Sequence, residues 1–163
     1  QEYLNAIGRV ANALIGGWQL NGIVAFASGN PFTVLTGQDR SLTGVNAQYA
    51  NLVGPNNGNL PPSQRTVERW FNTAAFELAP LGTFGNSGRN IVIGPGTNNF
   101  DFSLLKNIRI TETKTLQFRA EFFNAFNHPQ FLLPVADPTS AAFGQILAAR
   151  PAREIQFGLK FVF

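Results

Sequence analysis

The residue types that most often perform acid–base or metal chemistry are almost absent from this sequence. It has no cysteine and one histidine, His128, which lies between Asn127 and Pro129 with no nearby pair of carboxylates. A lone imidazole is a poor candidate for a metal site or a catalytic triad, so turn or loop packing is favoured. The segment 94–96 lacks the third glycine and following helix of a dinucleotide loop, and 85–88 is not a nucleophile elbow. The sequence therefore predicts no enzyme activity, no cofactor and no metal site.

Charged and amide side chains occur instead at alternate positions of two segments, 115–126 and 152–163. Alternate residues of an extended strand point to the same face, so each segment would present one polar face. On neighbouring strands these groups could pair with opposite charges. We favour the interpretation that these residues form a ladder of ion pairs on a solvent-exposed sheet face. The alternative is that they contact a substrate or another part of the protein. The candidate residues are Gln117, Arg119, Glu121, Glu154 and Lys160.

The strand that must position the last two of these residues is 152–163. Its odd-numbered residues, from Arg153 to Phe163, are mostly apolar, and its even-numbered residues are mostly polar. A strand of about 9–11 residues crosses an outer membrane with its apolar side toward lipid and its polar side toward the lumen of a barrel. The five residues above are therefore possible lumen-facing residues. The alternative is a half-buried strand of a soluble domain, which shows the same alternation.

The end of this strand resembles the C-terminal assembly signal of outer-membrane barrels. The signal has a polar residue, a glycine two positions later and then two hydrophobic positions separated by one residue, the last of them a terminal aromatic. An unpaired strand edge is a template for another strand, so the barrel-assembly machinery could capture it by backbone pairing. The matching residues are Gln156, Gly158, Phe161 and Phe163.

The composition fits such a wall better than an ordinary soluble domain. Charged residues make up 13% of the 163 residues, about half the usual share of roughly 25%, and sixteen residues are Phe. The net charge of +3 is weak and its Lys and Arg are scattered, which gives nucleic-acid binding little support. No stretch approaches the ~18 consecutive apolar residues of a transmembrane helix. Because the chain has no Met and starts at Gln1, we expect it to be a piece of a longer protein.

The alternation of apolar and polar residues predicts four strands, at about 17–36, 100–110, 115–126 and 152–163, with long loops at 37–98 and 127–150. The first strand should bend at Ser28–Pro31, because proline cannot donate a ladder hydrogen bond. A short turn at 111–114 joins the two middle strands, and Ser63–Phe71 is the one locally helical segment expected in the long loop. The predicted fold class is all-β: C-terminal antiparallel strands of a transmembrane β-barrel with long extracellular loops, which would form an open sheet in isolation.

Two further features need a place in this arrangement. Lys106 falls on the apolar face, where a charge at the bilayer midplane costs about 2–4 kcal/mol, so we expect it near the periplasmic boundary, where it can snorkel. The long loop carries four aromatic residues that could stack on a sugar or a peptide, although pinning the loop onto itself is favoured. They are Trp70, Phe71, Phe76 and Phe84.

Five motifs occur in order along the chain: GGWQLNGI at 16–23, SGNPFT at 28–33, FGNSGRN at 84–90, NFDFSL at 99–104 and FRAEFFNAFNHP at 118–129. Together they resemble the C-terminal end of Oar-like TonB-dependent receptors, large outer-membrane proteins that often carry an N-terminal carboxypeptidase-regulatory-like domain. The resemblance implies a 22-stranded barrel with a lumen plug, and uptake of an unidentified ligand driven through TonB. It also implies outer-membrane lipid, the barrel-assembly machinery, the rest of the barrel and plug, and TonB as partners, the last through an N-terminal part that is missing here.

Two other functions remain compatible with the sequence. In a soluble β-sandwich module, for example one that binds carbohydrate, the apolar strand faces would pack against each other. Another outer-membrane barrel, a porin or an adhesin, would share the same wall and differ in the sequence that precedes Gln1.

Overall fold

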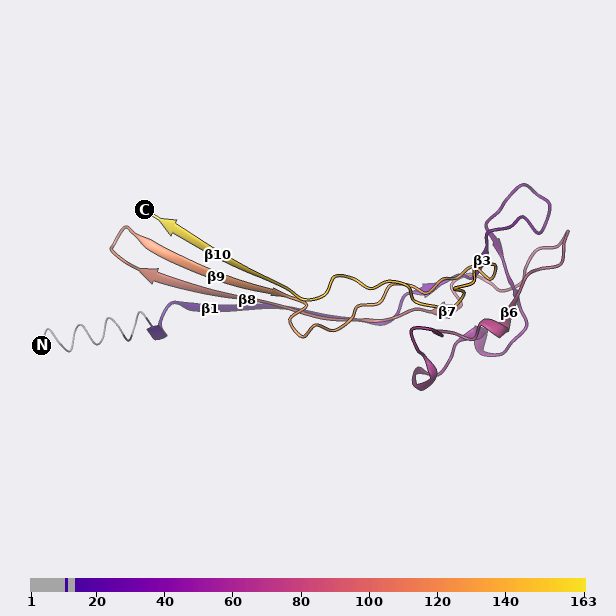
Figure 1. Ribbon diagram of the computed structural model, residues 1–163, viewed down its shortest axis with the longest axis horizontal. Coiled ribbons are helices and arrows are strands. Elements are labelled where there is room, and N and C mark those ends of the chain that lie inside the picture. Colours follow the sequence, from indigo (N-terminus) through magenta and orange to yellow (C-terminus); the bar gives the residue numbers. More distant parts are fainter. Residues whose placement is uncertain (1–10, 12–13) are drawn as a thin grey trace, which may run out of the picture. The chain divides into compact units, whose positions relative to one another are not determined.

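The chain forms two units in the computed structural model, which describes residue 11 and residues 14–163 (Figure 1). The sheet unit contains the described residues up to Phe26, together with Asn98–His128 and Pro151–Phe163. The loop unit contains Ala27–Thr97 and Pro129–Arg150. Among the described residues, no helix has both the length and the apolar character needed to cross a membrane.

The sheet unit is a four-stranded sheet in the order β1-β8-β9-β10, and Figure 1 shows these strands side by side. The pairs β8–β9 and β9–β10 are antiparallel. β1 also runs antiparallel to β8, because Gly17 lies beside Asn107 and Gly22 lies beside Phe102. The all-β class and the open antiparallel sheet are therefore confirmed. The strands are β1 (Trp18–Ala27), β8 (Thr97–Arg109), β9 (Thr115–Phe123) and β10 (Glu154–Val162).

One end of the sheet, the turn end, holds the short connection between β8 and β9. The Ile110 N–H donates to the carbonyl oxygen of Lys114 at 2.9 Å, and the Lys114 N–H donates to Thr111 Oγ1 at 3.1 Å. β10 also finishes at this end, since Val162 pairs with Thr115. At the opposite end, the loop end, β1 and β8 are joined by the long connection 28–96, and β9 and β10 by 124–153.

A turn at the loop end explains why β9 stops at Phe123 and does not continue to 126 as predicted. Asn124 and Asn127 have φ of 48° and 53°, a left-handed conformation that asparagine tolerates better than most residues. The Asn124 side chain closes the turn, because its Oδ1 accepts the His128 N–H and its Nδ2 donates to the His128 carbonyl, both at 3.0 Å. His128 thus takes part in a turn, as its sequence neighbours indicated.

β1 is likewise shorter than the predicted strand 17–36, because it ends at Ala27. The chain next to Gly29 passes so close to Gly94 that a Cβ at Gly29 would collide with the Gly94 backbone. After this approach, Pro31–Phe32 (β2) and Leu35–Thr36 (β3) pair with other segments of the loop unit and not with the large sheet.

The predicted loop at 37–98 lies mostly in the loop unit, which has short elements of its own. Three two-stranded ladders hold this unit, and where a helical segment was expected at Ser63–Phe71 the structure has a 3₁₀ turn that overlaps the start of that range. Two-residue strands are too short to leave a period in the sequence. The ladders are β2 with β7 (Val92–Ile93), β3 with β4 (Gln48–Tyr49) and β5 (Asn51–Leu52) with β6 (Phe76–Glu77); the 3₁₀ turns are η1 (Asn56–Gly58), η2 (Pro62–Gln64) and η3 (Thr73–Ala75).

An aromatic core joins the two long connections inside the loop unit. Phe71 is 1% exposed and its ring contacts those of Phe32, Phe76 and Phe143 edge to face, with centroids 5.2–5.8 Å apart. The Trp70 N–H donates to the Gly144 carbonyl at 2.9 Å. Segments from 28–96 and from 129–150 therefore form one packed body. Its buried residues are Phe32, Val34, Ala50, Phe71, Ala75, Phe76 and Val92.

Candidate functional site

The apolar face of the sheet is the first component of the candidate site. Phe157 and Leu159 are each 70% exposed, and no second layer of the described chain covers them. A soluble β-sandwich requires such a layer, so the structure does not support that alternative. Directly paired residues share a face, which assigns to this face Trp18, Leu20, Val24, Phe26, Phe100, Phe102, Leu104, Ile108, Leu116, Phe118, Ala120, Phe122, Ile155, Phe157, Leu159 and Phe161.

Aromatic rings gather at both ends of this face. At the loop end, the Phe100 ring lies 5.4 Å from that of Phe26 and 4.9 Å from that of Phe126, centroid to centroid. At the turn end, Trp18 begins β1, and Phe161 stacks on Phe163 at 5.9 Å. Rings also lie between these ends, where Phe118 stacks on Phe157 at 6.1 Å, so aromatic side chains run along the whole face. A Trp at the start of a strand, as at Trp18, is the type of residue that collects at a membrane–water interface.

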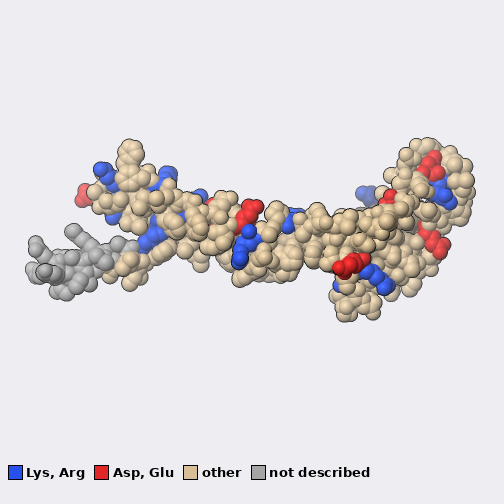
Figure 2. Space-filling view, in the orientation of Figure 1, with Lys and Arg blue, Asp and Glu red and all other residues tan. Residues whose placement is uncertain are grey.

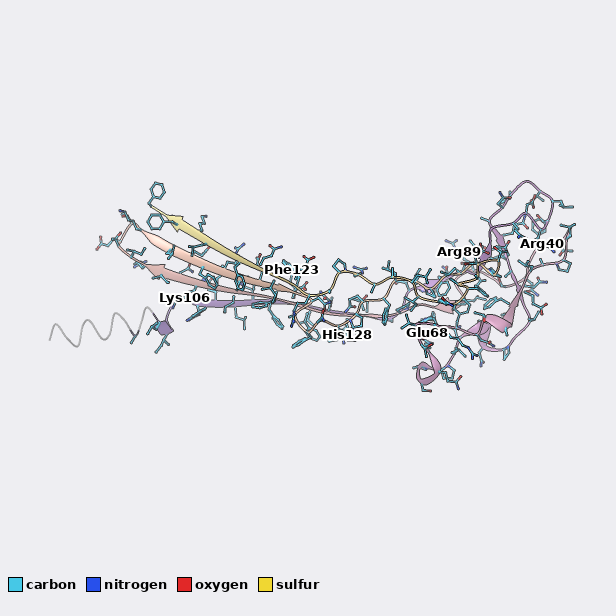
Figure 3. All side chains as sticks on the ribbon, in the orientation of Figure 1. Arg40, Glu68, Arg89, Lys106, Phe123 and His128 are labelled. Carbon is cyan, nitrogen blue, oxygen red and sulfur yellow. The ribbon has the colours of Figure 1, made fainter. Side chains whose placement is uncertain are left out.

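Lys106 lies on the apolar face near the turn end, as predicted, but it does not snorkel (Figure 3). It is 5% exposed. Its ammonium lies 4.8 Å from the centroid of the Trp18 ring and donates to the carbonyl oxygens of Leu14, at 3.2 Å, and Gly16. The chain before β1 therefore covers the charge with its own acceptors, which lowers the cost of placing a lysine on this face.

The polar face carries all five possible lumen-facing residues. Gln117 pairs with Lys160, Arg119 with Gly158, and Glu121 with Gln156, so these residues share one side of the sheet. Glu154 is on the same side, opposite Phe123. The register thus brings the predicted set together on one wall.

The predicted ladder of charge pairs between strands is not present in the described part of the chain. There the structure has one ion pair, between Arg119 Nη1 and Glu121 Oε1 at 3.5 Å, and both residues belong to β9. The reason is the register, because each charged residue of the set lies directly opposite a residue without charge. Sequence spacing specifies the face of a residue but not its partner on the next strand.

Three of the four predicted assembly residues lie on the edge strand β10, and the fourth, Phe163, directly follows it. β10 pairs with β9 on one side, and within the described residues no strand pairs with its other side. Gln156 and Gly158 are on the polar face, Phe161 is on the apolar face opposite Leu116, and Phe163 follows the strand. The free N–H and C=O groups of this edge can pair with another strand.

One comparison with known proteins identifies the family to which this sheet belongs. The family model described as "Outer membrane beta barrel domain" matches residues 1–156. The chain belongs to this family. Neither a curated protein nor a solved structure matches it. An outer-membrane barrel protein resides in the bacterial outer membrane with its apolar face toward lipid and its polar face toward the lumen, its short turns toward the periplasm and its long loops outside the cell. These assignments agree with the sequence prediction of localisation and fold.

In the loops of this outer-membrane barrel protein, three of the four predicted aromatic residues pin the loop unit together. Phe71 and Phe76 are buried in its core, and Trp70 packs against that core and donates from Nε1 to the Ile93 carbonyl at 2.9 Å. Phe84 differs, because it is 71% exposed. Of the four, only Phe84 presents most of its ring to a ligand or to solvent.

A polar loop in the same unit was not anticipated. Asp39 accepts the Gly44 N–H at 2.6 Å, the Thr43 N–H at 3.1 Å and Gln48 Nε2 at 2.7 Å. These bonds, that from Gly44 above all, hold the pKa of Asp39 below its ordinary value. Asp39 therefore orders its loop.

Among the described residues, no group of three or more His, Cys, Asp or Glu could hold a metal ion. Charged residues are also sparse on the face shown in Figure 2.

Proposed function

We propose that this outer-membrane barrel protein is a TonB-dependent receptor of the Oar-like group. The chain contributes to it a stretch of barrel wall, the extracellular loop unit and the assembly strand β10. The order of five motifs along nearly the whole chain supports the proposal. One of them, 118–129, contains most of β9 and the Asn124 turn.

The observation that carries the proposal is the loop unit. Loops that only rim a channel have no need of a shared core, whereas long loops with their own packing are usually functional. Here two extracellular connections fold together around Phe71 and Phe143. This fits a receptor that presents a defined surface to a ligand before uptake.

In this role the chain performs no catalysis. Ligand capture belongs to the loop unit, and transport requires a lumen plug and contact with TonB, which the resemblance assigns to other parts of the protein. A porin or an adhesin would use the same wall and the same edge strand, so the wall does not discriminate among these barrels.

Binding to TonB tests the proposal. The protein produced from its complete gene, purified in detergent, should retain the periplasmic domain of TonB from the same bacterium on an affinity column, and should conduct little current in a planar bilayer because a plug fills the lumen. A protein that fails to bind this domain and conducts ions steadily is a porin. Failure in both assays indicates a closed barrel of another kind, such as an adhesin.

A further inference from the structure

Charges on the polar face of the sheet are segregated along the strands. Directly paired residues of neighbouring strands form a row across the sheet. The three rows of the polar face nearest the turn end each contain one basic residue: Arg109 opposite Thr115, Lys160 opposite Gln117, and Arg119 opposite Gly158. The acidic residues occupy the next two rows toward the loop end. Glu121 pairs with Ser103 and Gln156, and Glu154 pairs with Phe123 in the following row. Asp101, two residues before Ser103 on the same face of β8, belongs to that end as well.

A hollow of about 300 Å³ lies in the basic half of this wall. Gly158, which has no side chain, is part of its lining, and a Cβ at this position would meet Arg119 Cβ at an ordinary contact distance of 3.8 Å. The cationic side chains in its lining are those of Arg119 and Lys160, and no acidic residue of the described chain lines the hollow. Gln117, also in the lining, donates from Nε2 to Asn107 Oδ1 at 2.9 Å.

Both cations retain hydrogen-bonding capacity toward the hollow. Arg119 uses one terminal nitrogen in its 3.5 Å contact with Glu121 and is half exposed, so other N–H groups of the guanidinium remain available. Lys160 has no ion pair and no side-chain hydrogen bond within residues 14–163. A guanidinium fork beside an ammonium is a combination that binds carboxylate and phosphate oxygens well.

We propose that this hollow is an oxyanion site on the lumen wall, and that its ligand is a carboxylate or phosphate group. Two sources share this chemistry: an anion dissolved in the lumen, and an acidic side chain of a polypeptide segment that occupies the lumen. The proposal requires only a barrel wall, so it stands or falls independently of coupling to TonB.

The test measures the melting temperature (Tm) of the complete gene product in detergent, with citrate as the probe and sodium chloride at equal ionic strength as the reference. Four variants are compared with the wild type: the double variant Arg119→Gln/Lys160→Gln, the single variant Lys160→Gln, and the controls Arg109→Gln and Glu121→Gln. Arg109→Gln removes a basic residue outside the hollow, and Glu121→Gln breaks the ion pair of Arg119 without removing a cation.

If a dissolved anion is the ligand, citrate raises the Tm of the wild type and of both controls, because a ligand that binds the folded state stabilises it. The double variant loses this shift, and Lys160→Gln reduces it. If an acidic side chain already fills the hollow, citrate has no effect on the wild type, but both the double variant and Lys160→Gln have a lower Tm than Glu121→Gln.

Two results would overturn the proposal. One is a citrate shift of equal size in the wild type and in Lys160→Gln, which would place anion binding elsewhere. The other result has two parts: citrate does not change the Tm of the wild type or of any variant, and the Tm values of Lys160→Gln and of the double variant are no lower than that of Glu121→Gln. The single variant keeps the test decisive if the double variant does not fold, because Lys160 makes no ion pair and no side-chain hydrogen bond within residues 14–163.

Discussion

The sheet unit and the loop unit place the same residue types in opposite environments. In the loop unit Phe71 and Phe76 are buried against other rings of that unit. In the sheet unit Phe157 and Leu159 are mostly exposed, and the described chain provides nothing to cover them. Burying such a side chain is worth about 1.5–3 kcal/mol. The loop unit therefore obtains its hydrophobic stabilisation from its own core, whereas the sheet must obtain it from lipid and from closure into a barrel.

This contrast predicts that the two units respond to different substitutions. Changes in the loop core should unfold the loops and spare the barrel. Changes on the apolar strand face should impair the barrel and spare the loops.

Phe71→Ala should have the largest effect. It removes a ring that contacts three others in the loop core, and such a truncation costs about 3–5 kcal/mol. The loop unit should become sensitive to added protease, while the barrel keeps its heat-modifiable mobility on a gel. Phe84→Ala is the matched control, because its ring is exposed and its loss should cost less than about 0.5 kcal/mol. Loss of heat-modifiability in Phe71→Ala would show that the units do not fold separately.

Phe157→Arg should destabilise the barrel by about 2–4 kcal/mol, the cost of a charge near the bilayer midplane. Phe157 is near the middle of β10 and on its apolar face, opposite Ala120, one row further from the turn end than Lys106. Gln156→Arg, in the same strand but on the polar face opposite Glu121, should change stability little. Urea titrations of the complete gene product in lipid vesicles measure both. Equal effects of the two substitutions would contradict the assignment of the faces.

Substitutions at Asn124 should have an intermediate effect on the turn that ends β9. Asn124→Ala loses two hydrogen bonds with His128 and strains a residue whose φ is 48°, which together should cost about 2–3 kcal/mol. Asn124→Gly relieves the strain and should recover about 1 kcal/mol of that loss. The same urea titrations compare the two variants, and an identical cost for both would mean that backbone strain plays no part.

The pH dependence of the Asp39 loop should be the smallest effect. The Gly44 N–H and other donors lower the folded-state pKa of Asp39 below its unfolded value of about 3.9. The carboxylate therefore stabilises the loop fully above that value, and the contribution disappears as the pH falls through the folded-state pKa. The hydrogen-exchange protection factors of residues 37–48, which are corrected for the intrinsic pH dependence of amide exchange, should stay constant from neutral pH down to about 5 and fall below about 4. In Asp39→Asn this dependence should be absent, and an unchanged profile would point to another group.

The sheet was predictable because its signal is local. Trp18 to Ala27 and Ile155 to Phe163 alternate with period two, and that alternation assigns each residue to a face without reference to any partner. The five residues Gln117, Arg119, Glu121, Glu154 and Lys160 were placed on one wall for the same reason. Their pairing was not predictable, because shifting one strand by two residues keeps every face and changes every partner.

The loop unit lies at the other extreme. Phe71 and Phe143 are in contact but far apart along the chain, and the ladders between them are two residues long. No periodic pattern of residues 37–98 could have indicated that they share a core with residues 129–150. Lys106 is a similar case. Its position on the apolar face followed from the alternation, but the groups that contact its ammonium, from Leu14, Gly16 and Trp18, belong to a segment distant in sequence.

The sequence by itself determined which side chains share a face of the sheet, because side-chain direction along a strand depends only on the parity of the position. Only the tertiary structure decided which charges are neighbours, how the lysine on the apolar face is satisfied, and that two long loops form one body. These outcomes depend on contacts between residues that the chain brings together only when it folds.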